Sequence, residues 1–474
     1  MHNTSRLRSA PIQKLMLISA ALLAGIALSG CGTGTTAVPA TVTVHGGTIT
    51  GKVLGGQQPV ENASVQLWAA GASGYGTAST PLVTGATTSN GSGIGGNSSN
   101  AGNTLTAGYF TITSDFTCPT VTVSTPLGNA TPVYLTIMGG NPINTATNAN
   151  LGLMAALGPC SGLSSSTFVN VNEITTVASV WALSPFMTAF DHVGTSSTNV
   201  LGLTNAFATV NKLVNIASGL PIGPTLPAGA TVPDQEMYAL GNILATCVNS
   251  TGSTGPSDTT SNCGKLFTFT TVGSEPTNTI DAALSIAQNP SHNVPGLFGQ
   301  ISATGAAFTT NETQPTSWTI AINYTGMNHP KGIAVDGSGN VWVPNAGTSQ
   351  VTSSVSMLAP QYNASIPATI NSITSTHINQ PSALAIDGSG NAWITNAGNS
   401  TLTEIGPTGT VGSTFSGNGL STPSGIAFDQ PGNIWISNSG VNSVSVFNGA
   451  GTTIGTYSGI GGITTPVGIA VNPQ

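Results

Sequence analysis

The spacing of hydrophobic and polar residues changes twice along the chain. Between Gly47 and Gly140, short runs that alternate apolar and polar residues are broken by Gly and Asn, a pattern typical of β-strands. From about Asn148 to Gly299, apolar residues recur at three and four residues, which predicts helices. After about residue 315 the alternation returns. The pattern therefore predicts a mainly β, multidomain chain with a helical domain in its middle.

The middle segment, which we delimit as 148–300, contains four runs with helical spacing. The first opens on Asn172, an N-cap candidate, and places Ile174 and Val177 on one helical face. Asp234 and Glu236 stand near the start of the third run, where carboxylates interact favourably with the helix dipole. The predicted helices cover Asn172–Leu183, Leu201–Ser218, Pro233–Cys247 and Thr277–Gln288.

The last third of the chain repeats one pattern. Each full copy has a proline, a short apolar run, an Asp-x-x-Gly-Asn turn and a tryptophan. The copies begin at Pro330, Pro381 and Pro423, and a fourth begins at Pro466, so their spacings are 51, 42 and 43 residues. This is the length of a four-stranded propeller blade. Because one blade cannot bury its own faces, the repeat predicts four-stranded sheets that stack on one another.

The aspartate and tryptophan of each copy have two interpretations. The aspartates could bind calcium and the tryptophans could form a ring that stacks on a ligand. However, each turn offers one carboxylate, whereas calcium takes about six to eight oxygen ligands. We therefore favour turn-forming aspartates, which cap backbone N–H groups, and tryptophans that pack between blades. The turn residues are Asp336, Asp387 and Asp429, and the packing residues are Trp342, Trp393 and Trp435.

Over residues 315–474 these copies resemble NHL-repeat propellers and the related virginiamycin B lyase-like propellers. The resemblance implies a propeller fold. It also implies a lyase activity as an alternative function, because the virginiamycin B lyases use a histidine and a magnesium ion at the propeller mouth. Within the repeats this chain has His329, His377 and a single glutamate, Glu404. Neither histidine matches the family's catalytic position, so we assign no catalytic residue, metal or cofactor.

The predicted propeller is short. Three full copies, with Ser317–Tyr324 as a preceding strand and Val467–Val471 as a following one, make at most four blades. Propellers of the resembling class commonly close with about six or seven. Three alternatives follow: an irregular or small ring, a second copy of the chain that completes the propeller, or a sequence that is part of a longer protein. An open ring would expose unpaired strand edges.

The first strand-rich segment, 45–140, resembles a carboxypeptidase-regulatory-like (transthyretin-like) β-sandwich. The resemblance is carried by Ile49–Val53, by the Pro-Val-x-x-Ala-x-Val pattern within Gln58–Leu67, and by Gly108–Ile112. Between these strands, Gly71–Asn103 is long and rich in Gly, Ser and Asn, and we expect a mobile excursion there. Such sandwiches are accessory modules, so the resemblance implies no catalysis.

The first thirty residues read as a leader. Three basic residues precede Leu15–Leu28, an apolar stretch too short to span a membrane comfortably. The tetrapeptide Leu28-Ser29-Gly30-Cys31 then resembles a bacterial lipobox, the alternative being an ordinary signal peptide with an incidental cysteine. The resemblance implies a lipoprotein signal peptide over 1–30, a lipidated Cys31 and a tether over 31–44. Since Gly32 is not the aspartate of an inner-membrane retention signal, we expect the outer membrane.

Four cysteines remain after the leader. An even number in an exported chain favours disulfides. Cys247 and Cys263 bracket a polar loop, so we pair them with each other and, by elimination, Cys118 with Cys160. A zinc site is the alternative, but the sequence has no Cys-x-x-Cys and no histidine near these cysteines.

The charge count excludes several classes of protein. With 7 Lys+Arg and 14 Asp+Glu, only 4% of the residues are charged. A coiled coil, a nucleic-acid binder or a charge-extended disordered chain would need more. Without residues 1–30 the chain has 4 Lys+Arg and 14 Asp+Glu, a net charge of −10. Because so few groups titrate, we expect stability to depend little on pH.

A binding role fits these features best. Asp191 and His192 could pair as acid and base, but neighbouring residues rarely face each other, and no Gly-x-Ser-x-Gly elbow supplies a nucleophile. We therefore predict a lipid-anchored cell-envelope scaffold whose propeller recognises a protein, peptide or glycan, without nucleic acid as a partner. The alternatives are a metal-dependent lyase or hydrolase at the propeller mouth, and a structural surface protein or adhesin.

Overall fold

The fold is known from a computed structural model that describes residues 44–83, 86–89, 107–113, 116–119, 131–142, 146–301, 306–359, 370–459 and 461–472. The expected signal peptide, Cys31 and the tether up to residue 43 lie outside the described residues, as does the 90–103 part of the Gly71–Asn103 loop. None of the helices within the described ranges is both long and apolar enough to span a bilayer.

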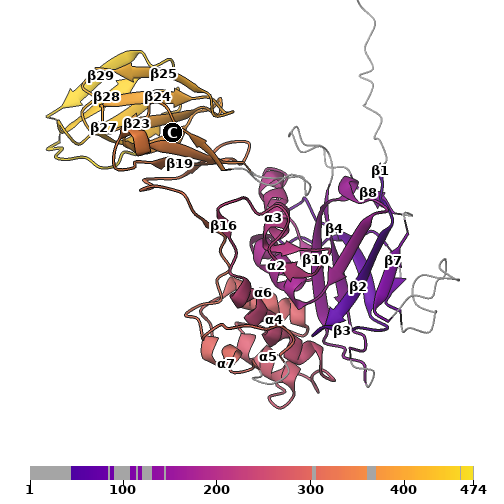
Figure 1. The fold of residues 1–474 in the computed structure, drawn as a ribbon. Helices are drawn as coiled ribbons and strands as arrows, with labels where there is room; N and C mark the ends of the chain where they lie inside the picture. Colours follow the sequence, from indigo (N-terminus) through magenta and orange to yellow (C-terminus); the bar gives the residue numbers. More distant parts are fainter. Residues whose placement is uncertain are drawn as a thin grey trace, which may run out of the picture. The chain divides into compact units, whose positions relative to one another are not determined.

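The N-terminal strands form two layers around a shared core (Figure 1). In β2 (Ile49–Gly55) every second residue is buried, so one face points into the core, as the alternating sequence predicts. The parallel pairing of β2 with β11 (Thr167–Val171) adds a further strand to that layer. One sheet has the order β10-β9-β4-β5 with β6 on β4, and comprises β4 (Ser64–Ala69), β5 (Thr80–Pro81), β6 (Ala86–Thr87), β9 (Pro132–Met138) and β10 (Gly152–Pro159). The other has the order β11-β2-β3 with β7 on β2, and includes β3 (Gln58–Pro59) and β7 (Tyr109–Ile112).

The expected boundary between sandwich and helical domain at 140–148 is wrong. Strands β10 and β11 belong to the sandwich sheets, and the helices begin only at Glu173. Nearly every residue of β10 is buried, because one side packs into the sandwich core and the other against α2 (Glu173–Leu183). A strand buried on both faces reads as a continuous apolar run and does not alternate, so the sequence pattern did not identify it.

Four of the helices match the sequence prediction closely. Helix α2 begins with a capping box in which Asn172 and Thr175 bond each other's backbone. The second predicted helix ends earlier than expected, because β14 (Val214–Asn215) pairs with β15 (Leu220–Pro221). Besides α2, the helices that match a predicted one are α3 (Val200–Leu213), α4 (Asp234–Val248) and α6 (Thr279–Gln288). The structure also contains two helices that were not predicted, α5 (Asn262–Thr270) and α7 (Val294–Phe298).

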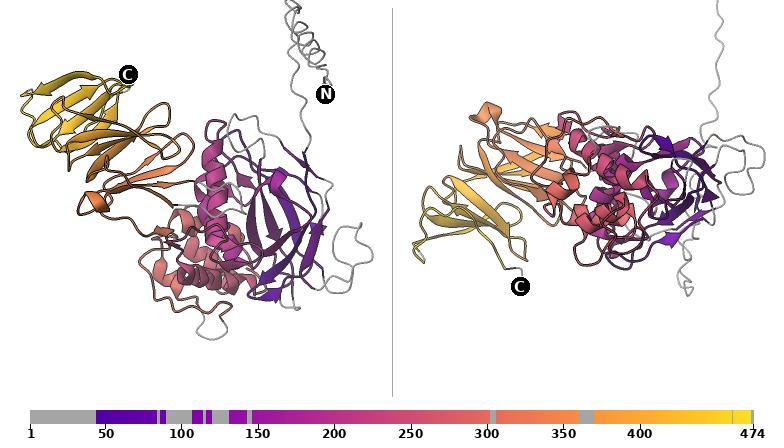
Figure 2. Two further views of the ribbon diagram at one scale, coloured as in Figure 1. Left: turned by 45° about the horizontal axis from the view of Figure 1, so that its top comes forward. Right: turned by 90° about the horizontal axis from the view of Figure 1, so that it is seen from below.

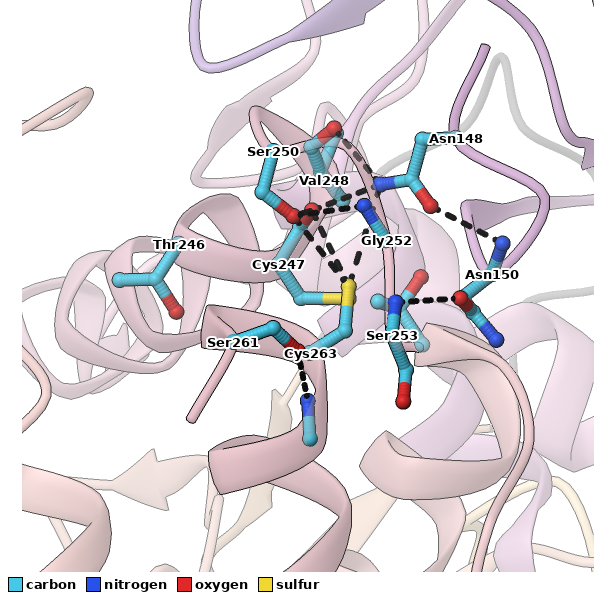
Figure 3. The surroundings of a disulfide bond; sticks show 12 residues. Asn148, Asn150, Thr246, Cys247, Val248, Ser250, Gly252, Ser253, Ser261 and Cys263 are labelled. Carbon is cyan, nitrogen blue, oxygen red and sulfur yellow. Dashed lines mark hydrogen bonds between the residues drawn. A yellow bond between two sulfur atoms is a disulfide. The ribbon is translucent and has the colours of Figure 1, made fainter. Parts of the chain in front are cut away.

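The structure contains the two expected disulfides. Cys118, in β8 (Thr117–Cys118), is joined to Cys160 at the end of β10, with the Cα atoms 5.7 Å apart. Cys247 in α4 is joined to Cys263 in α5. Figure 3 shows that this second disulfide lies beside Asn148, whose Nδ2 donates to the Cys247 carbonyl at 2.7 Å. The disulfide and this amide together fasten the polar loop after α4 to the end of the sandwich.

Two carboxyl groups in this part of the chain are unusually placed. Glu173 is completely buried at the start of α2, where its Oε1 accepts the Gly56 N–H at 2.8 Å and its Oε2 has no partner in the described part of the chain. Burial raises the pKa of Glu173 to about 7. Burial, followed by the charge of Glu312, likewise raises the pKa of Glu236 to about 7. The expectation that stability hardly depends on pH therefore needs revision.

We now expect the chain to be more stable in acid. Between about pH 4.5 and pH 7, folded Glu173 holds a proton that the unfolded chain has released, so the free energy of unfolding falls as the pH rises through this window. For Glu173 the loss is on the order of 3 kcal/mol. Denaturant titrations at pH 4.5 and pH 7.5 measure it. In Glu173→Gln, which keeps an acceptor for Gly56 and cannot titrate, the difference should shrink by the part that Glu173 contributes, while the part from Glu236 remains; an undiminished difference would contradict this assignment.

The C-terminal copies form three four-stranded antiparallel sheets, drawn in orange to yellow in Figures 1 and 2. We call them blades 1, 2 and 3. Each is a meander in which every strand pairs with the next one along the chain. Blade 1 comprises β18 (Ala334–Val335), β19 (Val341–Asn345), β20 (Ser354–Leu358) and β21 (Ile370–Ile373). Blade 2 comprises β22 (Pro381–Ile386), β23 (Ala392–Asn396), β24 (Thr401–Ile405) and β25 (Val411–Ser416), and blade 3 comprises β26 (Pro423–Phe428), β27 (Ile434–Asn438), β28 (Ser443–Phe447) and β29 (Thr453–Ser458).

The expected strand Ser317–Tyr324 does not precede blade 1 as a propeller strand. Trp318 is fully buried in the core of the helices, and its carbonyl accepts the indole N–H of Trp181 at 2.8 Å. Only β17 (Asn323–Tyr324) is extended, and it pairs with β16 (Ala230–Thr231). The large apolar side chain fills a helical core here, which the alternating pattern around it did not reveal.

Candidate functional site

The turn aspartate of each blade holds both its own turn and the following tryptophan. In blade 1, Asp336 Oδ1 accepts the backbone N–H groups of Ser338 and Asn340, both at 2.9 Å. Its Oδ2 accepts the Asn340 side-chain amide at 2.7 Å and the Trp342 indole N–H at 2.9 Å. The indole contact recurs at 3.0 Å between Asp387 and Trp393, and at 2.9 Å between Asp429 and Trp435.

In these contacts, the carboxylate oxygens of the aspartates accept hydrogen bonds from donors of the same chain. Burial alone would raise the pKa of Asp387, but the hydrogen bonds from Trp393 and Asn391 outweigh it and lower that pKa. The pKa of Asp429 is lowered in the same way. In the described ranges, no three His, Cys, Asp or Glu side chains gather in a group that could hold a metal ion. The turn role explains the positions of the aspartates in every copy.

Trp342 and Trp393 lie between blades, whereas Trp435 of blade 3 is only half-buried and stacks on Tyr457 of its own blade. Trp342 is fully buried in a cluster that includes Val355 of blade 1 with Ile394 and Ile405 of blade 2. Trp393 is buried in the equivalent cluster between blades 2 and 3 and stacks on Phe415, with ring centroids 5.6 Å apart. Trp342 and Trp393 therefore join the blades by packing.

Each blade also contains a buried asparagine that the sequence analysis did not predict. The residue three positions after each tryptophan is a buried asparagine, which donates to two hydroxyl groups on the neighbouring strand. Asn396 Nδ2, for example, donates to Thr401 and Thr403 at 3.2 and 2.9 Å. An asparagine stands three positions after the tryptophan of each of the three full repeat copies, so the repeat itself carried this signal. The equivalent residues are Asn345 with Ser354 and Ser356, and Asn438 with Ser443 and Ser445.

The first strands of the copies line a groove with a cavity volume of about 760 Å³. Equivalent positions of all four copies contribute to it, because these strands stand side by side at the start of each repeat. Small residues occupy one of these positions, with Gly332, Ala383, Gly425 and Gly468, and branched apolar residues occupy the next, with Ile333, Leu384, Ile426 and Ile469.

The polar groups in this groove are few. Lys331 and His329 line it at the first copy, and the His329 imidazole contacts the Asn328 side chain at 2.7 Å. Gln380, Ser382 and Ser424 also line it, whereas none of its lining residues is an aspartate or glutamate. The groove can thus offer amide and hydroxyl hydrogen bonds, one ammonium group and apolar contact area.

The other candidate residues lie elsewhere. His377 is exposed in the loop before blade 2 and is not part of the groove lining, and Glu404 lies on β24 opposite Trp393 in the strand register. Contrary to expectation, the neighbours Asp191 and His192 do contact each other, with Oδ1 and Nδ1 2.7 Å apart at the turn between β12 (Met187–Ala189) and β13 (His192–Val193). The structure does not bring this pair together with His329, His377 or Glu404 into one cluster.

Ser79 contacts the Asp191–His192 pair through its backbone. Its N–H donates to the Asp191 carbonyl at 2.8 Å. The Ser79 side chain, however, is buried and bonded to the Tyr134 hydroxyl at 2.7 Å and to the Val193 backbone. These bonds hold the Ser79 hydroxyl in the core, where it links the sandwich to the β12–β13 hairpin.

Comparisons with known proteins yield similarities in structure alone. No family model matches the chain, and no curated protein matches its sequence. Among solved structures, similar ones are a streptogramin B lyase (18% identity, TM-score 0.26, 31% of this chain and 45% of that one) and virginiamycin B lyase from Staphylococcus aureus (22%, 0.24, 30% and 44%). Another is a putative gluconolactonase (17%, 0.24, 30% and 51%). The chain thus spans about half the length of these propeller proteins, and at these TM-scores they indicate no activity for it.

Proposed function

We propose that the chain is a binding protein that takes a ligand into the inner groove of its propeller repeats. The observation that carries this proposal is the groove itself, which has a volume of about 760 Å³ and is lined by the same positions of four repeat copies. Ligand sites commonly occupy about 300–1,000 Å³ and combine apolar surface with a few polar groups. The stacked blades supply the rigid support that such a site needs.

The lining indicates the chemistry of the ligand. Small residues at the repeated position let a ligand approach the strand backbones closely, and the branched residues beside them offer apolar contact. The only ammonium group in the lining is that of Lys331. A peptide segment or a glycan with little charge fits these groups best, and an anionic substituent could meet Lys331.

A pair of glycine variants tests the groove. Gly332 lies in the groove, and Gly388 lies in the exposed turn of blade 2; a Cβ added at either would meet no atom within 4 Å, so both tolerate a side chain. The probes are a glycan array and a library of short peptides, and any ligand found is then titrated. Gly332→Tyr should weaken binding at least about tenfold, a loss of about 1.4 kcal/mol, while Gly388→Tyr should not. Equal affinities of both variants, or no ligand at all, would contradict the proposal.

We also propose that Cys31 is lipidated and holds the chain at the outer membrane. The support is the tetrapeptide Leu28-Ser29-Gly30-Cys31 directly after the apolar stretch. A diacylglyceryl group adds about 0.8 kcal/mol of membrane affinity per buried CH₂. Mass spectrometry of the N-terminal peptide should find a diacylated Cys31 at the mature end, and an unmodified cysteine or a retained leader would refute the anchor.

A further inference from the structure

Two adjoining cavities lie between helices α4, α5 and α7, which contact one another (Figure 1). The larger has a volume of about 440 Å³ and is lined by α5 and the chain around α7. The smaller, of about 230 Å³, is lined by the end of α4 and the turn between β2 and β3. Thr246 and Asn262 line both cavities, so the two form one continuous space, which we call the α4–α5 cleft. Asn262, Lys265 and Pro295 are exposed, so the cleft is open to solvent.

Two amide side chains in the lining of this cleft lack partners. Asn249 lines the smaller cavity and Gln300 the larger one, and neither side chain bonds to another described residue. Asn249 Oδ1 and Gln300 Nε2 are moreover buried, where an unpaired polar atom calls for an explanation. By contrast, the amide of Asn242 in the same lining is bonded at both ends to the Phe308 backbone, at 2.8 and 2.9 Å. Because nothing in the described chain fixes Asn249 and Gln300, each amide can turn its oxygen or its nitrogen toward a ligand.

The lining indicates a ligand rich in hydroxyl groups. A hydroxyl both donates and accepts hydrogen bonds, so it can pair with either end of an amide. A hydrocarbon would leave the amides unpaired, and a carboxylate accepts bonds without donating any. Lys265 is the only charged residue in the lining, so the cleft has little to attract a highly charged ligand.

The cleft also offers an apolar face and space for two rings. Phe269 is half-buried and lines the larger cavity, where its ring can stack on the C–H face of a sugar ring. Small residues keep both cavities open, with Ala245 in the smaller one and Gly296 and Gly299 in the larger one. The larger cavity alone falls within the range of about 300–1,000 Å³ that is typical of ligand sites. The smaller cavity continues it past Thr246 and Asn262.

We propose that the α4–α5 cleft binds an uncharged disaccharide, with one sugar ring in each cavity. Phe269 stacks on the ring in the larger cavity, and Gln300 bonds the hydroxyl groups of that ring. Asn249 bonds the hydroxyl groups of the ring in the smaller cavity, while Thr246 and Asn262 lie beside the link between the rings. This site is separate from the propeller groove, and the inference does not depend on the groove binding a ligand.

Saturation-transfer NMR on the full chain tests the site, with maltose, cellobiose, lactose and sucrose as probes. The sugar that binds best is then titrated by calorimetry. Gln300→Met and Asn249→Leu keep the approximate shape of the side chain but remove the amide, so each should raise the dissociation constant at least about tenfold. Both variants should fold, because an apolar group replaces an unpaired buried polar atom, and their thermal unfolding checks this. Gln430→Met, in the exposed turn between β26 and β27, is the matched control and should bind like the unmodified chain.

Each result decides the proposal. Binding of none of the four sugars at about 10 mM would overturn it. Unchanged dissociation constants in both Gln300→Met and Asn249→Leu would overturn it as well, since the sugar would then lie elsewhere. Gly332→Tyr, which fills the propeller groove, should leave the sugar affinity unchanged, and a loss in this variant would place the sugar in the groove and refute the cleft. Binding of glucuronate in place of the four uncharged sugars would refute the ligand class, because Lys265 would then select an acidic ligand.

Discussion

Replacing Trp393 by alanine is expected to destabilise the blades by about 3–5 kcal/mol. The side chain is 1% exposed and fills the cluster between blades 2 and 3, where Leu402, Ile436 and Phe447 surround it. Its removal leaves a cavity and the Asp387 carboxylate without the indole donor. Hydrogen exchange read by mass spectrometry on peptides from β22 to β28 should show faster opening of both blades, while the sandwich peptides stay protected.

Trp435→Ala is the matched control for this prediction. Trp435 donates to Asp429 at 2.9 Å just as Trp393 donates to Asp387, so both variants lose the same hydrogen bond. Trp435 is only half-buried, and no further blade covers it in the described residues, so the variant should cost about 1 kcal/mol. Equal losses in the two variants would mean that the indole–carboxylate bond, and not packing between blades, stabilises the repeats.

Removing the Cys118–Cys160 disulfide is expected to lower the free energy of unfolding of the sandwich by about 4 kcal/mol. The bond closes a segment of 42 residues, and the unfolded chain gains the entropy of that loop when it is cut. The double variant Cys118→Ser with Cys160→Ser is unfolded in urea and followed by tyrosine and tryptophan fluorescence. The matched pair, Cys247→Ser with Cys263→Ser, opens a segment of 16 residues and should lose about 3 kcal/mol.

The order of these two losses is the diagnostic result. Both cysteine pairs are buried, so both double variants also lose similar packing. If removing the Cys247–Cys263 disulfide lowered the free energy of unfolding more than removing Cys118–Cys160, loop entropy would not be the main effect. The contacts of Asn148 with the Cys247 carbonyl and the neighbouring loop would then account for the difference.

The sequence predicted elements that carry an alternating pattern or a capping signal, and it missed a strand that carries neither. The alternating residues of β2 and the capped start of α2 at Asn172 indicated their structures directly. Strand β10 is buried on both sides, so its sequence has no period and was assigned to the helical domain. Trp318 was placed in a propeller strand for a different reason, since the alternating pattern around it does not show which core its side chain enters.

The site was harder to predict than the repeat. The tryptophan and aspartate of each copy were recognised because they recur, but the hydrogen bond that joins them depends on how the turn folds back. The groove is formed by Gly332, Ala383, Gly425 and Gly468, which are far apart in sequence and carry no distinctive chemistry. Only the stacking of the blades brings these positions together. Likewise, the raised pKa of Glu173 follows from burial, which its place at a helix start does not reveal.

The most direct test of the central claim is to locate the bound ligand on the chain. Hydrogen exchange is measured for the free chain and for the chain saturated with the glycan or peptide selected in the binding screen. A ligand bound in the inner groove should slow hydrogen exchange in the segments 329–333, 380–384, 424–426 and 467–469, with little change in the sandwich and helices. Protection confined to the sandwich, or to the outer strands β25 and β29, would contradict a binding role for the groove.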